Sequence, residues 1–146
     1  MRYIIFFASV TILLFGLTVT QAAEDERQLV NLPDPMRDHM LSSMRDHLAT
    51  INEIQAELAK GDYDKAADTA EQRLGMSSLA AHNASHMAPF MPKAMQETGT
   101  EMHHAASRFA RTAQEAAVSG NLATALESLS KVTQQCVACH AGYRIH

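Results

Sequence analysis

The sequence is poor in several residue types that mark particular classes of protein. It has no tryptophan, 5% aromatic residues, two cysteines, six glycines and four prolines among its 146 residues. Two cysteines are too few for a disulfide-rich scaffold. So little glycine and proline excludes collagen-like and low-complexity chains. The 12 basic residues are outnumbered by 16 acidic ones, which argues against a nucleic-acid-binding protein.

The first 23 residues have the layout of a secretory signal peptide. Arg2 gives a positive start, residues 3–19 are uncharged and mostly apolar, and Ala22 and Ala23 precede three acidic residues. The apolar run is shorter than the roughly 20 residues that a membrane-spanning helix needs. We therefore expect cleavage after Ala22 or Ala23 and export of a single domain, residues 24–146, to a bacterial periplasm.

Apolar residues recur with helical spacing along the rest of the chain. The pattern predicts helices from Asp34 to about Lys60, from Asp62 to Gly75, from about Thr100 to Ser119, and from Asn121 onwards. No segment alternates as a strand would, and Pro89 and Pro92 interrupt the stretch between the second and third helices. The fold class expected is all-α, an antiparallel up-down four-helix bundle.

The same spacing predicts which side chains face the core. In the first helix these are Leu41, Met44, Leu48, Ile51, Ile54 and Leu58. In the last helix they are Leu122, Leu126, Leu129, Val132, Cys136, Cys139 and Tyr143.

The last helix ends in Cys136-Val137-Ala138-Cys139-His140, a C-x-x-C-H motif typical of c-type haem attachment. Residues three apart lie on one face of a helix, so both thiols can form thioethers to one porphyrin. The histidine that follows can bind the iron as its proximal ligand. A redox dithiol would begin a helix after a strand, and a structural zinc site usually needs four ligands. The motif therefore predicts one covalent haem c.

The ending Cys136-x-x-Cys139-His140-x-x-Tyr143-Arg144 resembles that of the class II cytochromes c, which include cytochrome c prime and its low-spin relatives. The resemblance implies a four-helix bundle with Cys136 and Cys139 as thioether residues and His140 as proximal ligand. It also implies that Arg144 lies near the proximal face of the haem. Members of this family often form homodimers through the first helix.

The residue on the other side of the iron is left open by the sequence. In the family a methionine there gives a low-spin electron carrier, whereas a leucine leaves an open site that binds nitric oxide or carbon monoxide. Family members often carry an arginine one turn earlier; Arg37 fits this position and places Leu41 over the iron. Counting back from the turn at Gly61 instead favours Met44. Met40 and His47 remain as alternatives.

A second group of histidines and methionines lies between His82 and His104. His82 and His86 are four residues apart, so on a continuous helix they would share a face and bind a metal ion together. Thioethers with imidazoles suit copper. The opposing interpretation is that methionines fill space in an irregular segment.

The function expected is single-electron transfer between periplasmic redox partners, with an acidic surface that favours a basic patch on the partner. The alternatives are a five-coordinate gas-binding protein and a copper-binding protein. Catalysis is not expected, because no nucleophile–base pair or paired carboxylates are recognisable, although an open haem is compatible with weak peroxidase-like turnover.

Overall fold

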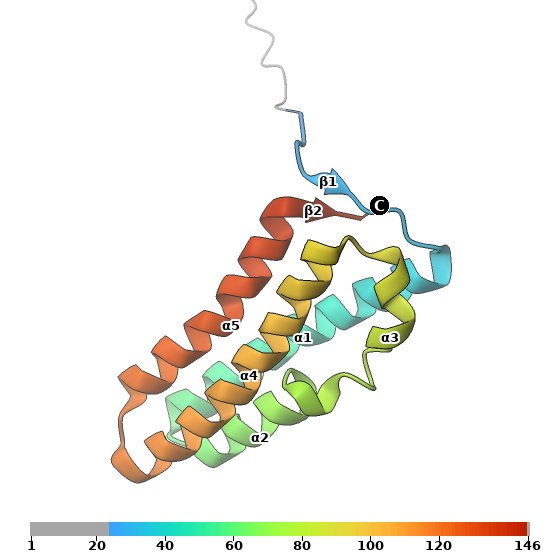
Figure 1. Cartoon of the computed structure of the whole chain (residues 1–146). Coiled ribbons are helices and arrows are strands. Elements are labelled where there is room, and N and C mark those ends of the chain that lie inside the picture. The colour runs from blue at the N-terminus through green and yellow to red at the C-terminus, as the bar shows by residue number, and fades with distance from the viewer. Residues whose placement is uncertain (1–23, 146) are drawn as a thin grey trace, which may run out of the picture.

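A computed structural model describes residues 24–145, and these residues form an all-α fold (Figure 1). The long helices are α1 (Asp34–Lys60), α2 (Tyr63–Arg73), α4 (Lys93–Ser119) and α5 (Leu122–Gly142). Between α2 and α4 lie the short 3-10 helix η1 (Met76–Ser78), the single turn α3 (Ala84–Met87) and the 3-10 helix η2 (Ala88–Phe90). The signal peptide that the sequence predicts falls outside the described residues.

Three of the helix ends follow directly from the local sequence. Gly61 and Gly120 end α1 and α4 with positive φ angles of 80° and 70°, a conformation that glycine adopts without a Cβ clash. The Asn121 side chain accepts a hydrogen bond from the backbone N–H of Thr124 at 3.2 Å and so caps α5. Both short connections were predicted from the sequence, and both are confirmed.

The start of α4 differs from the prediction. The helix begins at Lys93, directly after Pro92, and not near Thr100. Pro92 has the extended conformation of a residue that precedes a helix, with ψ 143°. Gly99 lies within the helix without breaking it, because a single glycine costs only about 1 kcal/mol relative to alanine.

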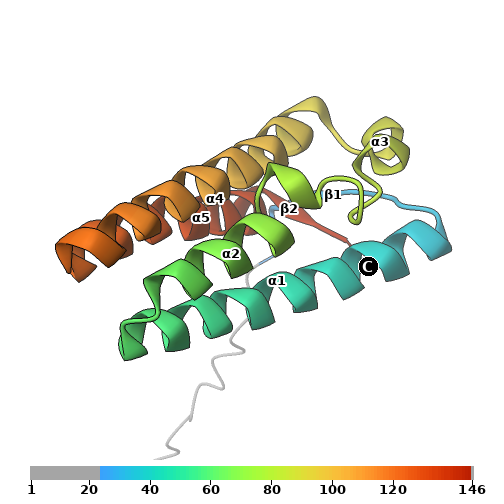
Figure 2. The ribbon, with the colours of Figure 1, turned by 90° about the horizontal axis from the view of Figure 1, so that it is seen from below.

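The helices pack in the order α1 on α2, α2 on α4 and α4 on α5 (Figure 2). Small side chains let α2 approach its neighbours closely, because Ala66, Ala67 and Ala70 are all buried. Phe109 of α4 and Ile54 of α1 are the largest fully buried side chains of the core. Leu129 and Val132 attach α5 to the same core, as predicted.

The buried faces of α1 and α5 agree with the prediction only in part, because Ile54, Leu58, Leu129 and Val132 are buried but four other predicted positions are exposed. Leu48 is 72% exposed, and Leu41, Leu122 and Leu126 are exposed as well. In α1 the buried positions include polar ones: His47, Thr50 and Glu57. Thr50 can be buried because its hydroxyl donates to the Asp46 carbonyl at 2.8 Å. Glu57 accepts hydrogen bonds from Thr69 at 3.3 Å and Lys65 at 3.2 Å.

A two-stranded parallel ladder that the sequence did not predict joins the two ends of the domain. Strand β1 (Gln28–Leu29) pairs with β2 (Tyr143–Arg144), and Val30 donates a further hydrogen bond to the Arg144 carbonyl at 2.8 Å. Two residues per strand are too short for a recognisable alternation. The ladder fixes the segment before α1 against the end of α5, beside the C-x-x-C-H motif. Among the helices of residues 24–145, none is long and apolar enough to cross a membrane.

Candidate functional site

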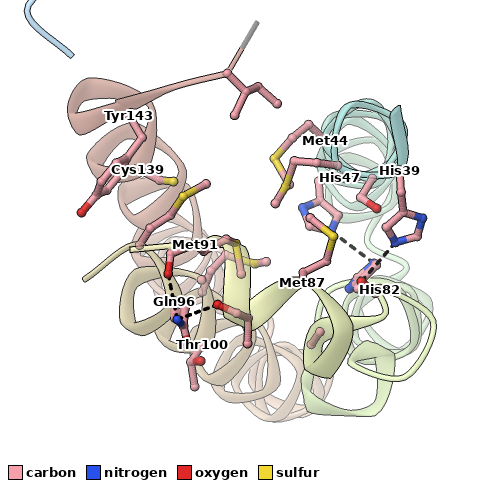
Figure 3. Close-up of a pocket in the computed structure, with 18 of the residues that line it drawn as sticks. His39, Met44, His47, His82, Met87, Met91, Gln96, Thr100, Cys139 and Tyr143 are labelled. Carbon is pink, nitrogen blue, oxygen red and sulfur yellow. Dashed lines mark hydrogen bonds between the residues drawn. The ribbon is translucent and has the colours of Figure 1, made fainter. Parts of the chain in front are cut away.

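A partly open cavity of about 430 Å³ lies between the end of α5, the first half of α1 and the irregular segment before α4. Its volume is within the range of about 300–1,000 Å³ found for small-molecule and cofactor sites. Most of its wall is apolar, and residues of α1 and α5 face each other across it (Figure 3).

The α5 wall carries the C-x-x-C-H motif. Cys139 and His140 line the cavity together with Tyr143, whereas Cys136 packs against the hydrophobic core and its thiol contacts the Val132 carbonyl at 3.7 Å. Both cysteines are free and half-buried. Burial raises the pKa of both thiols, and for Cys139 the neighbouring Cys136 raises it further. Redox dithiols need a lowered thiol pKa, so this site does not have their electrostatics.

The α1 wall carries the candidate distal residues. Met40, Leu41, Met44 and His47 all line the cavity. Figure 3 shows Met44 pointing from α1 into the cavity, towards the side that holds Cys139. Arg37 is not among the lining residues. It instead pairs with Asp34 at 3.0 Å and with Asp38 at 3.5 Å.

Sulfur-containing side chains cover the side between these walls. Met87, Met91, Met95 and Met102 all line the cavity. Gln96 of α4 holds the irregular segment in place, because its side-chain amide donates to the carbonyls of Ala88 at 2.8 Å and Met91 at 2.9 Å (Figure 3). Methionine is flexible and polarisable, so this cover suits a large, flat and apolar guest.

Two arginines stand at the edge of the cavity near His140. Arg27 donates to the His140 carbonyl at 3.3 Å and is paired with Asp25 at 2.7 Å. Arg144 lies 3.6 Å from the same carboxylate, and its buried Nε atom has no hydrogen-bond partner. These guanidinium groups hold the pKa of Asp25 at about 2, with the Arg27 hydrogen bond as the main cause. The resemblance implied that Arg144 lies near the proximal face of a haem, and Arg144 does line the cavity. Arg27 lines it as well, although the sequence did not single it out.

A cluster of three histidines forms the end of the cavity farthest from the C-x-x-C-H motif. His47 of α1 and His82 approach each other with their Nε2 atoms 3.2 Å apart, and the ring of His103 lies 5.3 Å from that of His82 between centroids. Burial lowers the pKa of all three, that of His47 to about 4. The three imidazoles are therefore neutral at pH 7.

The structure separates His82 from His86, so the two do not form the pair that a continuous helix would give. Asn83 adopts a left-handed conformation with φ 49°, which separates the two histidines onto different elements, and His86 is exposed. In residues 24–145, no group of three or more His, Cys, Asp or Glu side chains is arranged to hold a metal ion.

The sequence offered His47 as an alternative iron ligand and His82 as a member of the His/Met group, but it did not predict that the two contact each other. Arg27 was missed as well. Arg27 is far from the motif in the sequence, and only the β1–β2 ladder shows that the two lie close together. Comparison with known proteins gives no match among family models, curated proteins or solved structures.

Proposed function

We propose that this protein is an exported monohaem c-type cytochrome that carries single electrons between redox partners. The observation that carries the proposal is the position of the C-x-x-C-H motif. Cys139 and His140 line a largely apolar cavity whose opposite wall holds Met40 and Met44. A covalent haem needs two thiols on one helix face, an imidazole beside them and an apolar pocket; the C-x-x-C-H spacing and the mostly apolar lining support the proposal.

Cys136 and Cys139 would attach the haem. Each thiol adds its sulfur and its hydrogen across one vinyl double bond, so that a thioether forms and no atom leaves. Both thiols are free for this addition. His140 would hold the iron on the α5 side, and Arg144 and Arg27 at the cavity edge would meet the acidic groups of the haem.

Met44 is the methionine that we propose as the second iron ligand, with Met40 as the alternative. It comes from the α1 wall, points into the cavity and lies opposite Cys139 (Figure 3). An axial methionine raises the reduction potential of a haem relative to a second histidine. The haem supplies the one-electron chemistry, and the chain supplies the ligands, the apolar surroundings and the edge charges.

The remaining parts of the proposal concern the whole protein. The four long helices are proposed to form an antiparallel up-down bundle, consistent with the packing order of α1, α2, α4 and α5. The periplasm is the proposed location, with removal of residues 1–23. The proposed partners are periplasmic redox proteins, which an acidic net charge of −4 would steer towards a basic patch. A homodimer is a further proposal from the family resemblance.

The test is covalent attachment. The chain is expressed together with a haem-attachment system, and its mass and denatured absorption spectrum are measured. We expect one haem that stays bound after denaturation, loss of one thioether in Cys136→Ser or Cys139→Ser, and no change in Val137→Ala. Val137 lies between the cysteines but is exposed, so it is a matched control. A chain that carries no covalent haem would overturn the proposal.

A further inference from the structure

We propose that His47, His82 and Met87 form a Cu(I) site at the end of the cavity farthest from the C-x-x-C-H motif. None of its residues is among those proposed above to hold the haem. His47 comes from α1, His82 from the turn before α3, and Met87 from the end of α3. All three side chains line the same cavity.

The spacing of the two imidazoles fits a shared metal ion. Their Nε2 atoms are 3.2 Å apart. Two ligand atoms about 2.0–2.1 Å from one metal ion, at the tetrahedral angle, lie about 3.3 Å from each other. The rings are also steeply inclined to each other, with an interplanar angle of 74°. Without metal, the same two atoms share a single hydrogen bond.

Hydrogen bonds behind His82 leave its Nε2 atom ready to bind. The Ser78 hydroxyl donates to the Gly75 carbonyl at 2.7 Å, so its oxygen is left to accept from His82 Nδ1 at 3.4 Å. A proton on Nδ1 leaves the lone pair on Nε2, which faces His47. Metal-binding histidines commonly donate their other ring N–H to a neighbouring acceptor in this way.

Backbone contacts also fix the position of the His82 ring. The His39 ring donates to the His82 carbonyl at 3.1 Å, and this bond ties the turn to α1. The ring of His103 is also fixed by a backbone contact, because its Nδ1 donates to the Leu74 carbonyl at 2.7 Å. His103 nevertheless stays a neighbour of the site, since its ring centroid is 6.2 Å from that of His47.

The third ligand decides which metal fits. No group of three or more His, Cys, Asp or Glu side chains in residues 24–145 can hold a metal, so zinc lacks the ligands of its usual sites. The buried thioether of Met87 points towards His47 and His82 in Figure 3. Two neutral imidazoles and one soft thioether in an apolar wall favour Cu(I) over harder ions.

The test is an anaerobic competition titration for Cu(I) with bathocuproine disulfonate. The chain carries Cys136→Ser and Cys139→Ser, because free thiols would bind Cu(I) themselves and because haem attachment is then excluded. The failure of this proposal is thereby separated from that of the proposed cytochrome function. We expect one Cu(I) per chain and a loss of at least 100-fold in affinity in His82→Gln and in Met87→Leu.

Matched variants complete the test. His104→Gln, an exposed histidine on α4, should leave the affinity unchanged. Ser78→Ala should weaken binding by about 10–100-fold, as expected for a supporting residue. Absence of Cu(I) binding, or equal affinity in His82→Gln, Met87→Leu and His104→Gln, would overturn the proposal. If the doubly substituted chain does not fold, the same variants are compared in the chain whose two thiols have been alkylated, by the same criterion.

Discussion

Among single residues, His47 shows most clearly how burial changes chemistry. It is 9% exposed and is packed against His82 and His103, with Asp46 and Arg73 as further charged neighbours. Burial is the main cause of its low pKa of about 4, followed by repulsion from His82 and His103. The imidazole must therefore lose its proton on folding at any pH between about 4 and about 6.5, the ordinary value.

This shift predicts how stability depends on pH in the metal-free Cys136→Ser/Cys139→Ser chain. The unfolded state binds more protons in this window, so the free energy of unfolding rises with pH. The same stability is lost again as the pH falls from about 6.5 to about 4. His47 contributes about 3 kcal/mol of this change, and the pKa values of His82 and His103 shift in the same direction. Urea denaturation at a series of pH values measures it. His47→Gln should flatten the profile, and His104→Gln should not.

The thiols of the C-x-x-C-H motif give a second prediction at this scale. Burial raises the pKa of Cys136 and Cys139, so the haem-free wild-type chain holds little thiolate at pH 8. We expect iodoacetamide to alkylate both cysteines more slowly in the folded chain than in the same chain unfolded in urea. Fast alkylation of either thiol in the folded chain at pH 7 would instead indicate the electrostatics of a redox dithiol.

Among the elements, α4 is the central helix of the core, since it contacts both α2 and α5. Its Phe109 side chain is 0% exposed, whereas Val118 on the same helix is 92% exposed. Phe109→Ala should lower the free energy of unfolding by about 3–5 kcal/mol, because it leaves a cavity. Val118→Ala should change it by no more than about 0.5 kcal/mol. Chemical denaturation of both variants measures the difference, and equal stabilities would contradict the assignment of the core.

The elements also show which parts of the fold local sequence can predict. Gly61, Gly120 and Asn121 act through their own backbone or side chain, so the ends of α1 and α4 and the start of α5 could be predicted. The buried face of α1 could not, because His47 and Glu57 are buried only with partners from other elements. The early start of α4 was missed because Pro92 was taken only as an interruption, whereas in the structure it directly precedes the helix.

At the scale of the whole molecule, the candidate site joins segments that are far apart in the sequence. The C-x-x-C-H motif and Met44 were identified from sequence alone, and the cavity brings Cys139, His140 and Met44 together. Arg27 lies near His140 because the β1–β2 ladder pairs the two ends of the domain, and His82 lies near His47 because its segment packs against α1. Such contacts depend on tertiary packing, and residue spacing carries no signal for them.

The central claim is a haem held between His140 and Met44, and the optical spectrum of the exported protein tests it most directly. The protein is measured oxidised and reduced, with and without carbon monoxide, beside Met44→Leu and Met40→Leu. We predict sharp low-spin bands, a weak far-red sulfur-to-iron band in the oxidised protein, and no response to carbon monoxide. Met44→Leu alone should become high-spin and bind carbon monoxide. A wild-type protein that is high-spin and binds carbon monoxide, or one without covalent haem, would contradict the account.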